Sequence, residues 1–198
     1  MHSIEINRRP SRIHAHREAN AIATLTLAFS ADPANRWCWP ETAEYLAGFP
    51  QFVRGLGGNA FTAECAFEIG GGAGVALWLP PGVEPDEEEL IAIIQRSVHA
   101  SRQGDLFELI QQMEQHHPKT PHWYLPFVGV EPMQQNRGLG ALLLRPILER
   151  CDHERLPAYL ESTNPRNVPF YESLGFAQVG MIRSGTSPEI VPMLREPQ

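Results

Sequence analysis

The spacing of apolar residues in the first part of the chain predicts two amphipathic helices. Arg17–Phe29 carries one broad apolar face, and Thr42–Leu56 carries another before Gly57, where a helix readily ends. A short strand is expected within Ile4–Ala15. The proline-containing stretch Ala31–Pro40 separates the two helices and is expected to be a loop.

The middle of the chain predicts a hairpin and two further helices. Strands are expected at Ala60–Ile69 and Gly74–Leu79, and three glycines lie between them. These glycines favour a hairpin turn, because no Lys-Ser/Thr pair and no helix follow them as in a phosphate-binding loop. The next helix begins at Asp86, which has capping-box spacing to Glu89 and precedes an apolar run. Another helix is expected at Leu106–His116.

Strands and helices alternate in the last third of the chain, and this alternation indicates the fold class. In chain order the pattern predicts a strand at Trp123–Val130, a loop at Glu131–Arg137, a helix at Gly138–Cys151, a strand at Ala158–Glu161, a short helix at Asn167–Leu174, and strands at Phe176–Arg183 and Ile190–Leu194. Hairpins followed by such alternation are typical of an α/β domain with a mixed sheet. No repeat or linker marks a boundary, so residues 1–198 are expected to form one domain.

Composition narrows the picture mainly by exclusion. A net charge of −7 argues against binding to nucleic acid, so no nucleic-acid partner is expected. No apolar run approaches the roughly 18 residues of a membrane-spanning helix, so no membrane partner is expected either. The polar first eighteen residues lack the apolar core of a signal peptide. Three widely separated cysteines give neither a disulfide framework nor a zinc-site spacing. We therefore expect a cytoplasmic protein without a metal site.

The segment between the strand at Trp123–Val130 and the following helix has the character of an anion-binding loop. Gly138 and Gly140 lie where the helix begins, so the backbone there can approach a ligand closely. The first turn of a helix offers free N–H groups to a phosphate, and Arg137 adds a positive charge. The segment is neither a Walker A motif nor a dinucleotide-binding fingerprint. A tight strand–helix turn without a ligand is the alternative.

Two separate motifs make the chain resemble one family. Val-x-Pro-x-x-Gln-x-x-Gly-x-Gly runs from Val130 to Gly140, and Asn-x-x-x-Tyr-Glu-x-Leu-Gly-Phe runs from Asn167 to Phe176. In this order and at this separation they resemble the GCN5-related N-acetyltransferases, the GNAT family. Shorter matches after His116 are similar to puromycin N-acetyltransferase and its bacterial relatives, but the likeness thins before that point, so puromycin is not implied as a substrate. The resemblance implies an α/β (α+β) fold, with a mixed, mostly antiparallel central sheet that contains a splayed strand pair and is flanked by helices.

The resemblance also implies acetyl-coenzyme A as the acyl donor. Backbone groups of one strand would hold the pantetheine arm as an added strand, and N–H groups of the glycine segment would hold the pyrophosphate. Two asparagines could contact the pantetheine or cap the short helix, and both readings stay open. The cofactor-binding residues so implied are Phe127, Val128, Gly129 and Val130 for the arm, Gln135, Asn136, Arg137, Gly138, Leu139, Gly140 and Ala141 for the pyrophosphate, and Asn164 and Asn167.

The catalytic candidates are a tyrosine and a glutamate. Tyr171 is expected to protonate the departing thiolate, because a phenol is protonated at neutral pH; a core-packing role is the alternative. Glu161, at a strand end, is a candidate general base acting directly or through water, or else a solvated strand end. His122 and Tyr124 are alternative bases. The histidines near His116 lack the carboxylate or cysteine that would complete a metal site.

The leading interpretation is an enzyme that acetylates the amine of a small molecule by direct attack in a ternary complex. Neither motif contains a cysteine, which disfavours a covalent acyl-enzyme; Cys151 lies at the far end of its helix. A non-catalytic acyl-coenzyme A sensor is the alternative, and Tyr171 is the residue that a pure binder need not retain. The aromatic residues around Trp37 could line an acceptor pocket or simply pack in the core. A protein acceptor and a homodimer also stay open.

Overall fold

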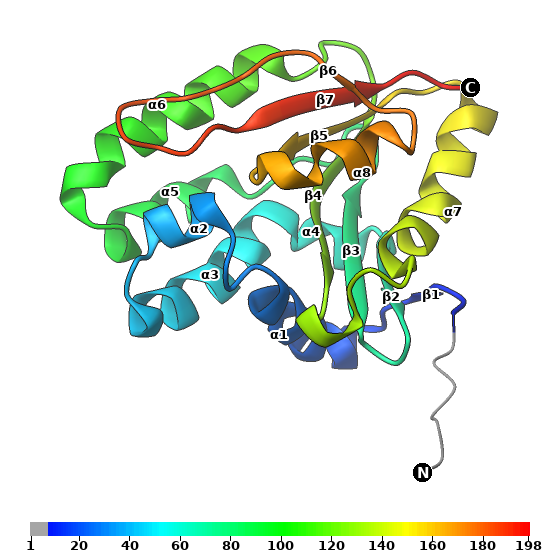
Figure 1. Cartoon of the computed structure of the whole chain (residues 1–198), viewed down its shortest axis with the longest axis horizontal. Coiled ribbons are helices and arrows are strands. Elements are labelled where there is room, and N and C mark those ends of the chain that lie inside the picture. The colour runs from blue at the N-terminus through cyan, green and yellow to red at the C-terminus, as the bar shows by residue number, and fades with distance from the viewer. Residues whose placement is uncertain (1–7) are drawn as a thin grey trace.

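The structure, a computed structural model, describes residues 8–198 and is built around one mixed sheet (Figure 1). Within these residues the sheet has seven strands in the order β1-β2-β3-β4-β5-β7-β6, and every neighbouring pair is antiparallel except β4 and β5. The fold class expected from the sequence is confirmed. The strands are β1 (Ser11–Arg12), β2 (Ala66–Ile69), β3 (Gly74–Leu79), β4 (Trp123–Val130), β5 (Ala158–Ser162), β6 (Ala177–Gln178) and β7 (Val191–Arg195).

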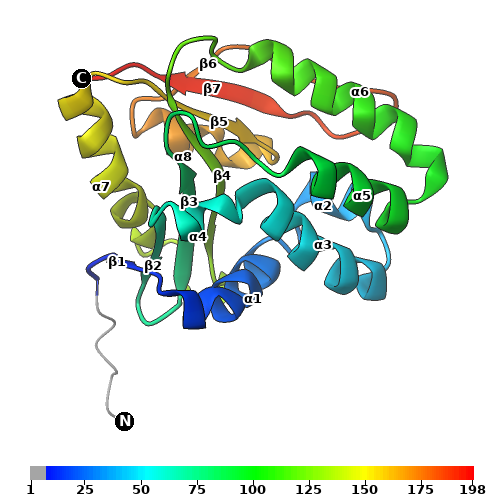
Figure 2. The same cartoon turned by 180° about the vertical axis from the view of Figure 1, so that it is seen from behind.

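Helices cover both faces of this sheet. The α-helices are α1 (Glu18–Ala28), α2 (Pro33–Cys38), α3 (Thr42–Gly57), α4 (Asn59–Thr62), α5 (Glu87–Ser97), α6 (Ala100–His116), α7 (Leu139–Glu154) and α8 (Val168–Glu172); the 3₁₀ helices are η1 (Ala15–Arg17), η2 (Pro132–Gln134) and η3 (Pro165–Asn167). One hydrophobic cluster packs α7 and α8 against the strands, and a second packs α1, α3 and α5 against the other face. Figure 2, seen from behind, shows α4 in front of β3 and α3 to the right of it.

The sheet opens between its two central strands. β4 and β5 pair only at Trp123–Ala158 and Tyr124–Tyr159. Beyond Tyr124, β4 continues along β3 as far as Val130, whereas β5 pairs with β7 over its whole length. The edge of β4 that faces the opening therefore carries backbone groups that β5 does not pair. The splayed strand pair implied by the resemblance is present in this chain.

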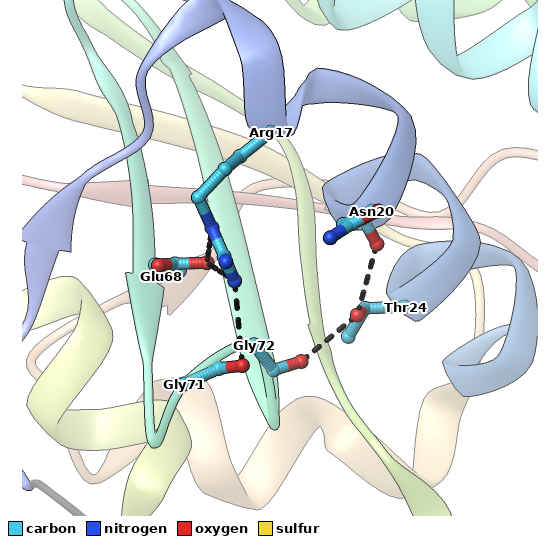
Figure 3. A network of polar contacts seen from close by, with 6 residues as sticks. All are labelled: Arg17, Asn20, Thr24, Glu68, Gly71 and Gly72. Atoms are coloured by element: carbon cyan, nitrogen blue, oxygen red, sulfur yellow. Dashed lines mark hydrogen bonds and ion pairs between the residues drawn. The ribbon is translucent and has the colours of Figure 1, made fainter.

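A network of polar contacts fastens the start of α1 to the β2–β3 hairpin (Figure 3). The guanidinium of Arg17 donates from Nε and Nη2 to Oε2 of Glu68, at 3.2 and 2.9 Å. Thr24 Oγ1 lies 2.8 Å from the carbonyl oxygen of Gly72. Because β3 leads from this hairpin along β4, the network also fixes where α1 crosses the sheet. It thereby positions one wall of the opening.

One predicted loop is wrong, because Ala31–Pro40 contains the helix α2. Asp32 has extended backbone and accepts a hydrogen bond from the N–H of Asn35 at 3.0 Å, and Pro33 occupies the first helical position. An Asp-Pro pair thus starts a helix here, because the carboxylate satisfies a free N–H and proline has none to satisfy. The prolines were misread as loop residues.

Three predicted boundaries are also wrong. The strand expected at Ala60–Ile69 begins only at Ala66, since α4 takes up its first residues, and α6 begins at Ala100, six residues before the predicted start. Of the strand predicted at Phe176–Arg183, only the short β6 and a single bridge between Ile182 and Ile190 are present, whereas the strand predicted at Ile190–Leu194 is present as β7. The first strand is present as β1; the part of its predicted range before Arg8 lies outside the described residues. Interactions beyond the local pattern decide all of these boundaries.

Candidate active site at the strand opening

The loop that follows β4 presents an uninterrupted run of free backbone N–H groups. No acceptor bonds the amides of residues 136–141 within the part of the chain that the structure describes, and the first amide of α7 that is bonded is that of Leu142, at 3.2 Å from the Gly138 oxygen. Asn136 and Gly138 have left-handed backbone, with φ of 60° and 77°. This conformation turns successive N–H groups inward, which makes an anion-binding concavity at the positive end of a 16-residue helix.

Two arginines add charge to this loop, one of which the sequence analysis missed. Arg137 lies in the loop and is exposed. Arg8, from before β1, donates from Nη2 to the carbonyl oxygen of Arg137 at 2.6 Å, and its Nη2 lies 3.6 Å from where a Cβ on Gly138 would be. Arg8 is 129 residues away in sequence, so no local signal could have placed it at this loop.

Two of the glycines implied to bind the cofactor, Gly129 and Gly140, have close packing neighbours. A Cβ on Gly129 would lie 2.8 Å from the Cβ of Ala28, so glycine lets α1 lie directly on β4. A Cβ on Gly140 would lie 3.1 Å from Cζ of Phe170. Gly140 therefore has a packing role against α8, and whether its N–H also holds a ligand stays a prediction. Gly138 is the glycine whose backbone conformation the loop requires.

The two asparagines that follow β5 differ in what they do. The side chain of Asn164 accepts a hydrogen bond from the N–H of Arg166 at 3.1 Å and so caps η3. Asn167, at the start of α8, is exposed and makes no side-chain cap. The capping role is therefore real for Asn164 and absent for Asn167. Contact of either residue with a cofactor stays a prediction.

Glu161 lies in a cluster of aromatic and titratable side chains. Its Oε1 is 3.1 Å from Nε2 of His117, and its side chain is only 3% exposed against 27% for His117. The imidazole also packs edge-on against Tyr124 and Tyr159, with ring centroids 4.7 and 4.5 Å apart. Burial and then the nearby Glu161 carboxylate raise the pKa of both phenols. His122 completes this Glu161 cluster, its ring 5.4 Å from that of His117.

Two polar atoms in the Glu161 cluster are buried without a hydrogen-bond partner among the described residues. They are Oε1 of Glu161 and the hydroxyl of Tyr159. The contact between Glu161 and His117 has the distance of an ion pair, but not the alignment of a hydrogen bond. Leaving such atoms unpaired is costly, by about 1–3 kcal/mol each, and native proteins tolerate it mainly where a ligand or a proton transfer uses them. The Glu161 cluster therefore has the properties of a functional site.

Tyr171 occupies the other face of the sheet. It is 8% exposed and packs against Phe170 and Phe176, with ring centroids 5.1 and 6.1 Å apart. Burial, followed by the charge of Asp32, raises the pKa of its hydroxyl. A phenol in this setting is protonated at neutral pH, as a proton donor must be. Its packing and its proposed chemistry are both compatible with the structure.

Asp32 is a second residue that the sequence analysis missed. Beyond capping α2, it accepts a hydrogen bond from Thr163 Oγ1 at 2.7 Å, directly after β5. Burial raises the pKa of this carboxyl. The contact ties the loop after α1 to the strand beyond the opening. Its only local signal is the Asp-Pro pair, which predicts a cap and no long-range partner.

The two catalytic candidates lie on opposite faces of the sheet. Along β5, Leu160 belongs to the hydrophobic cluster that contains Tyr171, while Tyr159 belongs to the cluster on the α1 and α3 side. Side chains alternate along a strand, so Glu161 points to the same side as Tyr159. A group held in the opening between β4 and β5 would thus have the Glu161 cluster on one side and Tyr171 on the other.

The aromatic residues near Trp37 mainly pack in the core. Trp39 and Phe49 are buried, and Trp39 donates from Nε1 to Ser97 Oγ at 3.2 Å. Trp37 is half-buried and donates to Thr186 Oγ1 at 3.1 Å. Core packing is the better account of Trp39 and Phe49. The structure places them in the same hydrophobic cluster as Phe127 of β4, so they pack against the strand that lines the opening.

Metal-binding and membrane-spanning features are also absent from residues 8–198. No three His, Cys, Asp or Glu side chains there are grouped so that they could hold a metal ion. No helix in that range has both the length and the apolar character needed to cross a membrane.

The splayed sheet and the loop of free amides at the end of one central strand are the features expected of an acyltransferase that draws its acyl group from a coenzyme A thioester. Residues 74–176 match the sequence profile of the acetyltransferase (GNAT) family, and the chain belongs to this family. The expectations of a GNAT enzyme and of a transferase of acyl groups are thereby confirmed. GNAT enzymes use acetyl-coenzyme A as acyl donor.

Relatives and solved structures agree with this assignment. A Schizosaccharomyces pombe protein described as an uncharacterized N-acetyltransferase is 28% identical over an alignment of 219 positions that covers 94% of this chain and 83% of the relative. A Corynebacterium glutamicum structure described as histone acetyltransferase HPA2 and related acetyltransferase has a TM-score of 0.65 at 24% identity, over 96% of both chains. Arylalkylamine N-acetyltransferase 2 from Aedes aegypti has a TM-score of 0.64 at 14% identity, over 96% of this chain and 99% of that one. At these identities the two structures show the fold alone.

Proposed function

We propose that this chain, as one catalytic domain, transfers an acetyl group from acetyl-coenzyme A to the primary amine of a small molecule. The observation that carries the proposal is the run of unbonded amides at residues 136–141, which lies at the end of the open edge of β4. The Glu161 cluster and Tyr171 flank that opening from its two faces. This arrangement supplies an anchor for the donor and a proton acceptor and donor beside it.

The residues fit coenzyme A at both ends of its arm. The N–H groups of residues 136–141 have no acceptor among the described residues, so they are available to donate hydrogen bonds to a diphosphate. Arg8 and Arg137 add positive charge there. Backbone groups of β4 from Phe127 to Val130 that face the opening can pair with the amide groups of pantetheine. Acetyl-coenzyme A supplies an activated acetyl thioester at this place.

The chain's own groups then manage the protons. An amine is protonated at neutral pH and must lose a proton before it can act as a nucleophile, and the Glu161 cluster offers a buried base for this. Glu161 is the candidate carried from the sequence, acting directly or through water. On the other face, the Tyr171 hydroxyl keeps its proton at neutral pH and can give it to a leaving thiolate.

The cysteines argue for direct attack rather than an acyl-enzyme. Burial raises the pKa of the Cys38 and Cys151 thiols to about 12, and it raises that of Cys65 as well. None of the three supplies a thiolate at neutral pH, which is the form that would accept an acetyl group. All three are free thiols, which fits a reducing compartment such as the cytoplasm.

The acceptor class rests on the electrostatics of the Glu161 cluster. A buried carboxylate surrounded by aromatic faces attracts an ammonium group through charge and through the ring quadrupoles. An acceptor protein of the size of a histone would have to bring its amine to the buried Glu161 side chain, whereas a small amine can enter the opening by itself. Two of the structures with this fold are described as agmatine and arylalkylamine N-acetyltransferases, which suggests where an acceptor search should begin.

The test is an acceptor panel read by mass spectrometry. The protein is incubated with acetyl-coenzyme A and with agmatine, spermidine, tyramine, tryptamine or a short peptide, and each amine is examined for a gain of one acetyl group. Acetylation of one of the small amines, in preference to the peptide, is expected. The Gly138→Asp variant, whose loop would repel pyrophosphate, serves as the inactive control.

Three outcomes would contradict the proposal. Preferential acetylation of the peptide would move the acceptor to proteins. Tight coenzyme A binding without turnover of any amine would favour an acyl-coenzyme A sensor. An acetyl group retained on a cysteine of the protein would replace direct attack by an acyl-enzyme.

A further inference from the structure

The arrangement within the Glu161 cluster distinguishes its carboxylate from its imidazole. The Glu161 side chain is 3% exposed, whereas that of His117 is 27% exposed. Tyr124 and Tyr159 pack against the same imidazole from β4 and β5. An incoming ammonium group therefore meets the imidazole more readily than the buried carboxylate.

The two nitrogens of His117 have different surroundings. Nε2 lies 3.1 Å from Oε1 of Glu161, and Nδ1 has no hydrogen-bond partner among residues 8–198. The backbone holds the ring in place, because the N–H of His117 donates to the Met113 oxygen at 3.1 Å and ends α6, with Pro118 following. A carboxylate against one imidazole nitrogen fixes the proton on that nitrogen and leaves a lone pair on the other.

We propose that His117 is the group that takes the proton from the acceptor ammonium, and that Glu161 is a positioning residue acting through it. This inference rests on the proposed acetyltransferase function. The ammonium N–H bond breaks, its electron pair stays on the amine, and the proton bonds to Nδ1 of His117. The resulting imidazolium keeps its Nε2–H toward the Glu161 carboxylate, and the exposed part of the ring later releases the proton to water.

The cluster is built to stabilise the charged product of that step. The contact of His117 with Glu161 becomes an ion pair only when the imidazole is protonated, and Oε1 of Glu161 has no well-aligned hydrogen-bond donor among residues 8–198. The aromatic rings of Tyr124 and Tyr159 also favour a cation beside them. The Glu161 carboxylate thus gains a charged partner when the proton arrives, which is the moment at which catalysis requires it.

The titratable groups that face the imidazole come from three segments. They are Glu161 and Tyr159 on β5, Tyr124 on β4, and His122 in the segment before β4. Burial raises the pKa of both tyrosines, so they do not titrate near neutral pH. His122 donates from Nδ1 to the carbonyl oxygen of Thr120 at 2.9 Å, and burial lowers the pKa of its ring. His122 is therefore the competitor that an experiment must separate from His117.

The pH profile of kcat/KM, measured with an amine acetylated in the panel, tests the proposal. Wild type should show a rise as the base loses its proton. His117→Gln should lose that rise and about 10²- to 10⁴-fold in rate, as for removal of a general base. Glu161→Gln should keep the rise but lower the rate, because the imidazolium loses its carboxylate. His116→Gln, the same exchange one position earlier on a ring bonded to Gln112, should match wild type.

Chemical rescue separates a proton-transfer role from a structural one. Imidazole added to the His117→Gly variant should restore part of kcat/KM in proportion to its unprotonated concentration, which a purely structural defect would not allow. The proposal is overturned if Glu161→Gln abolishes the rise while His117→Gln keeps it, since the carboxylate would then be the base. It is also overturned if His122→Gln alone removes the rise.

A measurement without an acceptor keeps this inference separate from the proposed function. Nitrogen-15 spectra of histidine-labelled protein at high pH should show His117 with its proton on Nε2. A proton on Nδ1 would leave that nitrogen no lone pair and would overturn the proposal. If no amine is acetylated, the proposed function is contradicted by the acceptor panel alone. The tautomer of His117 still tests whether its Nε2 proton faces Glu161.

Discussion

The loop that would hold the donor and the cluster that would receive the acceptor are built in different ways. The loop is six consecutive amides at residues 136–141, and its shape depends on left-handed backbone at Asn136 and Gly138. The Glu161 cluster joins the end of α6, the segment before β4, and both central strands. The loop would recognise a ligand through its backbone, whereas the cluster would act through its side chains. A donor shared by a whole family suits the first construction, and an acceptor that differs among enzymes suits the second.

The largest loss of kcat expected outside the Glu161 cluster comes from Tyr171, on the other face of the sheet. Tyr171→Phe keeps the ring and its packing against Phe176 and removes the hydroxyl proton. We expect kcat to fall by about 10²-fold, the lower end for a general acid because water can substitute partly, with coenzyme A affinity unchanged. Steady-state kinetics, calorimetry with coenzyme A and the melting temperature measure the three quantities. A variant within threefold of wild-type kcat, with chemistry rate-limiting, would assign Tyr171 to packing alone.

The next largest effect is expected from variants that change the loop at residues 136–141 and leave the Glu161 cluster intact. Asn and Asp both tolerate left-handed backbone better than other side chains, so Gly138→Asn and Gly138→Asp form a matched pair that differs in charge. The Asp variant should lose at least about 100-fold in coenzyme A affinity, through repulsion of the pyrophosphate, and the Asn variant much less. Calorimetry measures both affinities. Equal losses in the two variants would mean that geometry rather than charge governs the loop.

A smaller effect on coenzyme A affinity is expected when either of the two arginines at the loop is removed. Arg137→Ala should weaken coenzyme A binding by about tenfold, or ~1.4 kcal/mol, as for loss of one charge-assisted hydrogen bond. Arg8→Ala tests whether the arm before β1 adds to this site or only braces the carbonyl of Arg137. Repeating both titrations with dephospho-coenzyme A shows which phosphate each arginine meets. Unchanged affinity in both variants would restrict recognition to the backbone amides.

The smallest expected effect concerns the link that Asp32 makes with Thr163. Because burial raises the pKa of this carboxyl, the folded state holds a proton that the unfolded state has released. The stabilisation is present below the unfolded pKa and is lost as pH rises through the folded value. Asp32→Asn keeps a capping side chain and should flatten the pH dependence of the melting temperature between about pH 4 and 7. Asp86→Asn, the same exchange at the exposed cap of α5, is the control; equal effects would contradict the role of burial.

The contrast between the two regions also explains what the sequence could predict. Gly74–Leu79 and Trp123–Val130 were predicted with the bounds that the structure has, because period and turn residues agree there. The loop at residues 136–141 could be predicted because consecutive residues, glycines among them, determine its backbone conformation. The contact of Arg8 with Arg137, 129 positions away, and that of Asp32 with Thr163, 131 positions away, left no local pattern.

The Glu161 cluster lies between these extremes. Glu161 could be selected as a polar residue at a strand end, and His122 and Tyr124 could be listed beside it. Their arrangement around His117 follows only from the parallel register of β4 and β5 and from the point where α6 ends. Sequence reasoning therefore selected several members of this cluster and missed His117, the residue in contact with the carboxylate. Register is the piece of information that periodicity cannot supply.

Hydrogen exchange of the backbone amides tests most directly whether the two regions divide the work as described. Amides without an acceptor exchange quickly and become protected when a ligand accepts from them. Saturating coenzyme A should protect peptides that contain residues 136–141 and leave those around His117 unchanged, and the latter should respond only when an acetylated amine is also present. No protection of residues 136–141 at saturating coenzyme A would contradict the assignment of the donor site, and with it the account of how this enzyme works.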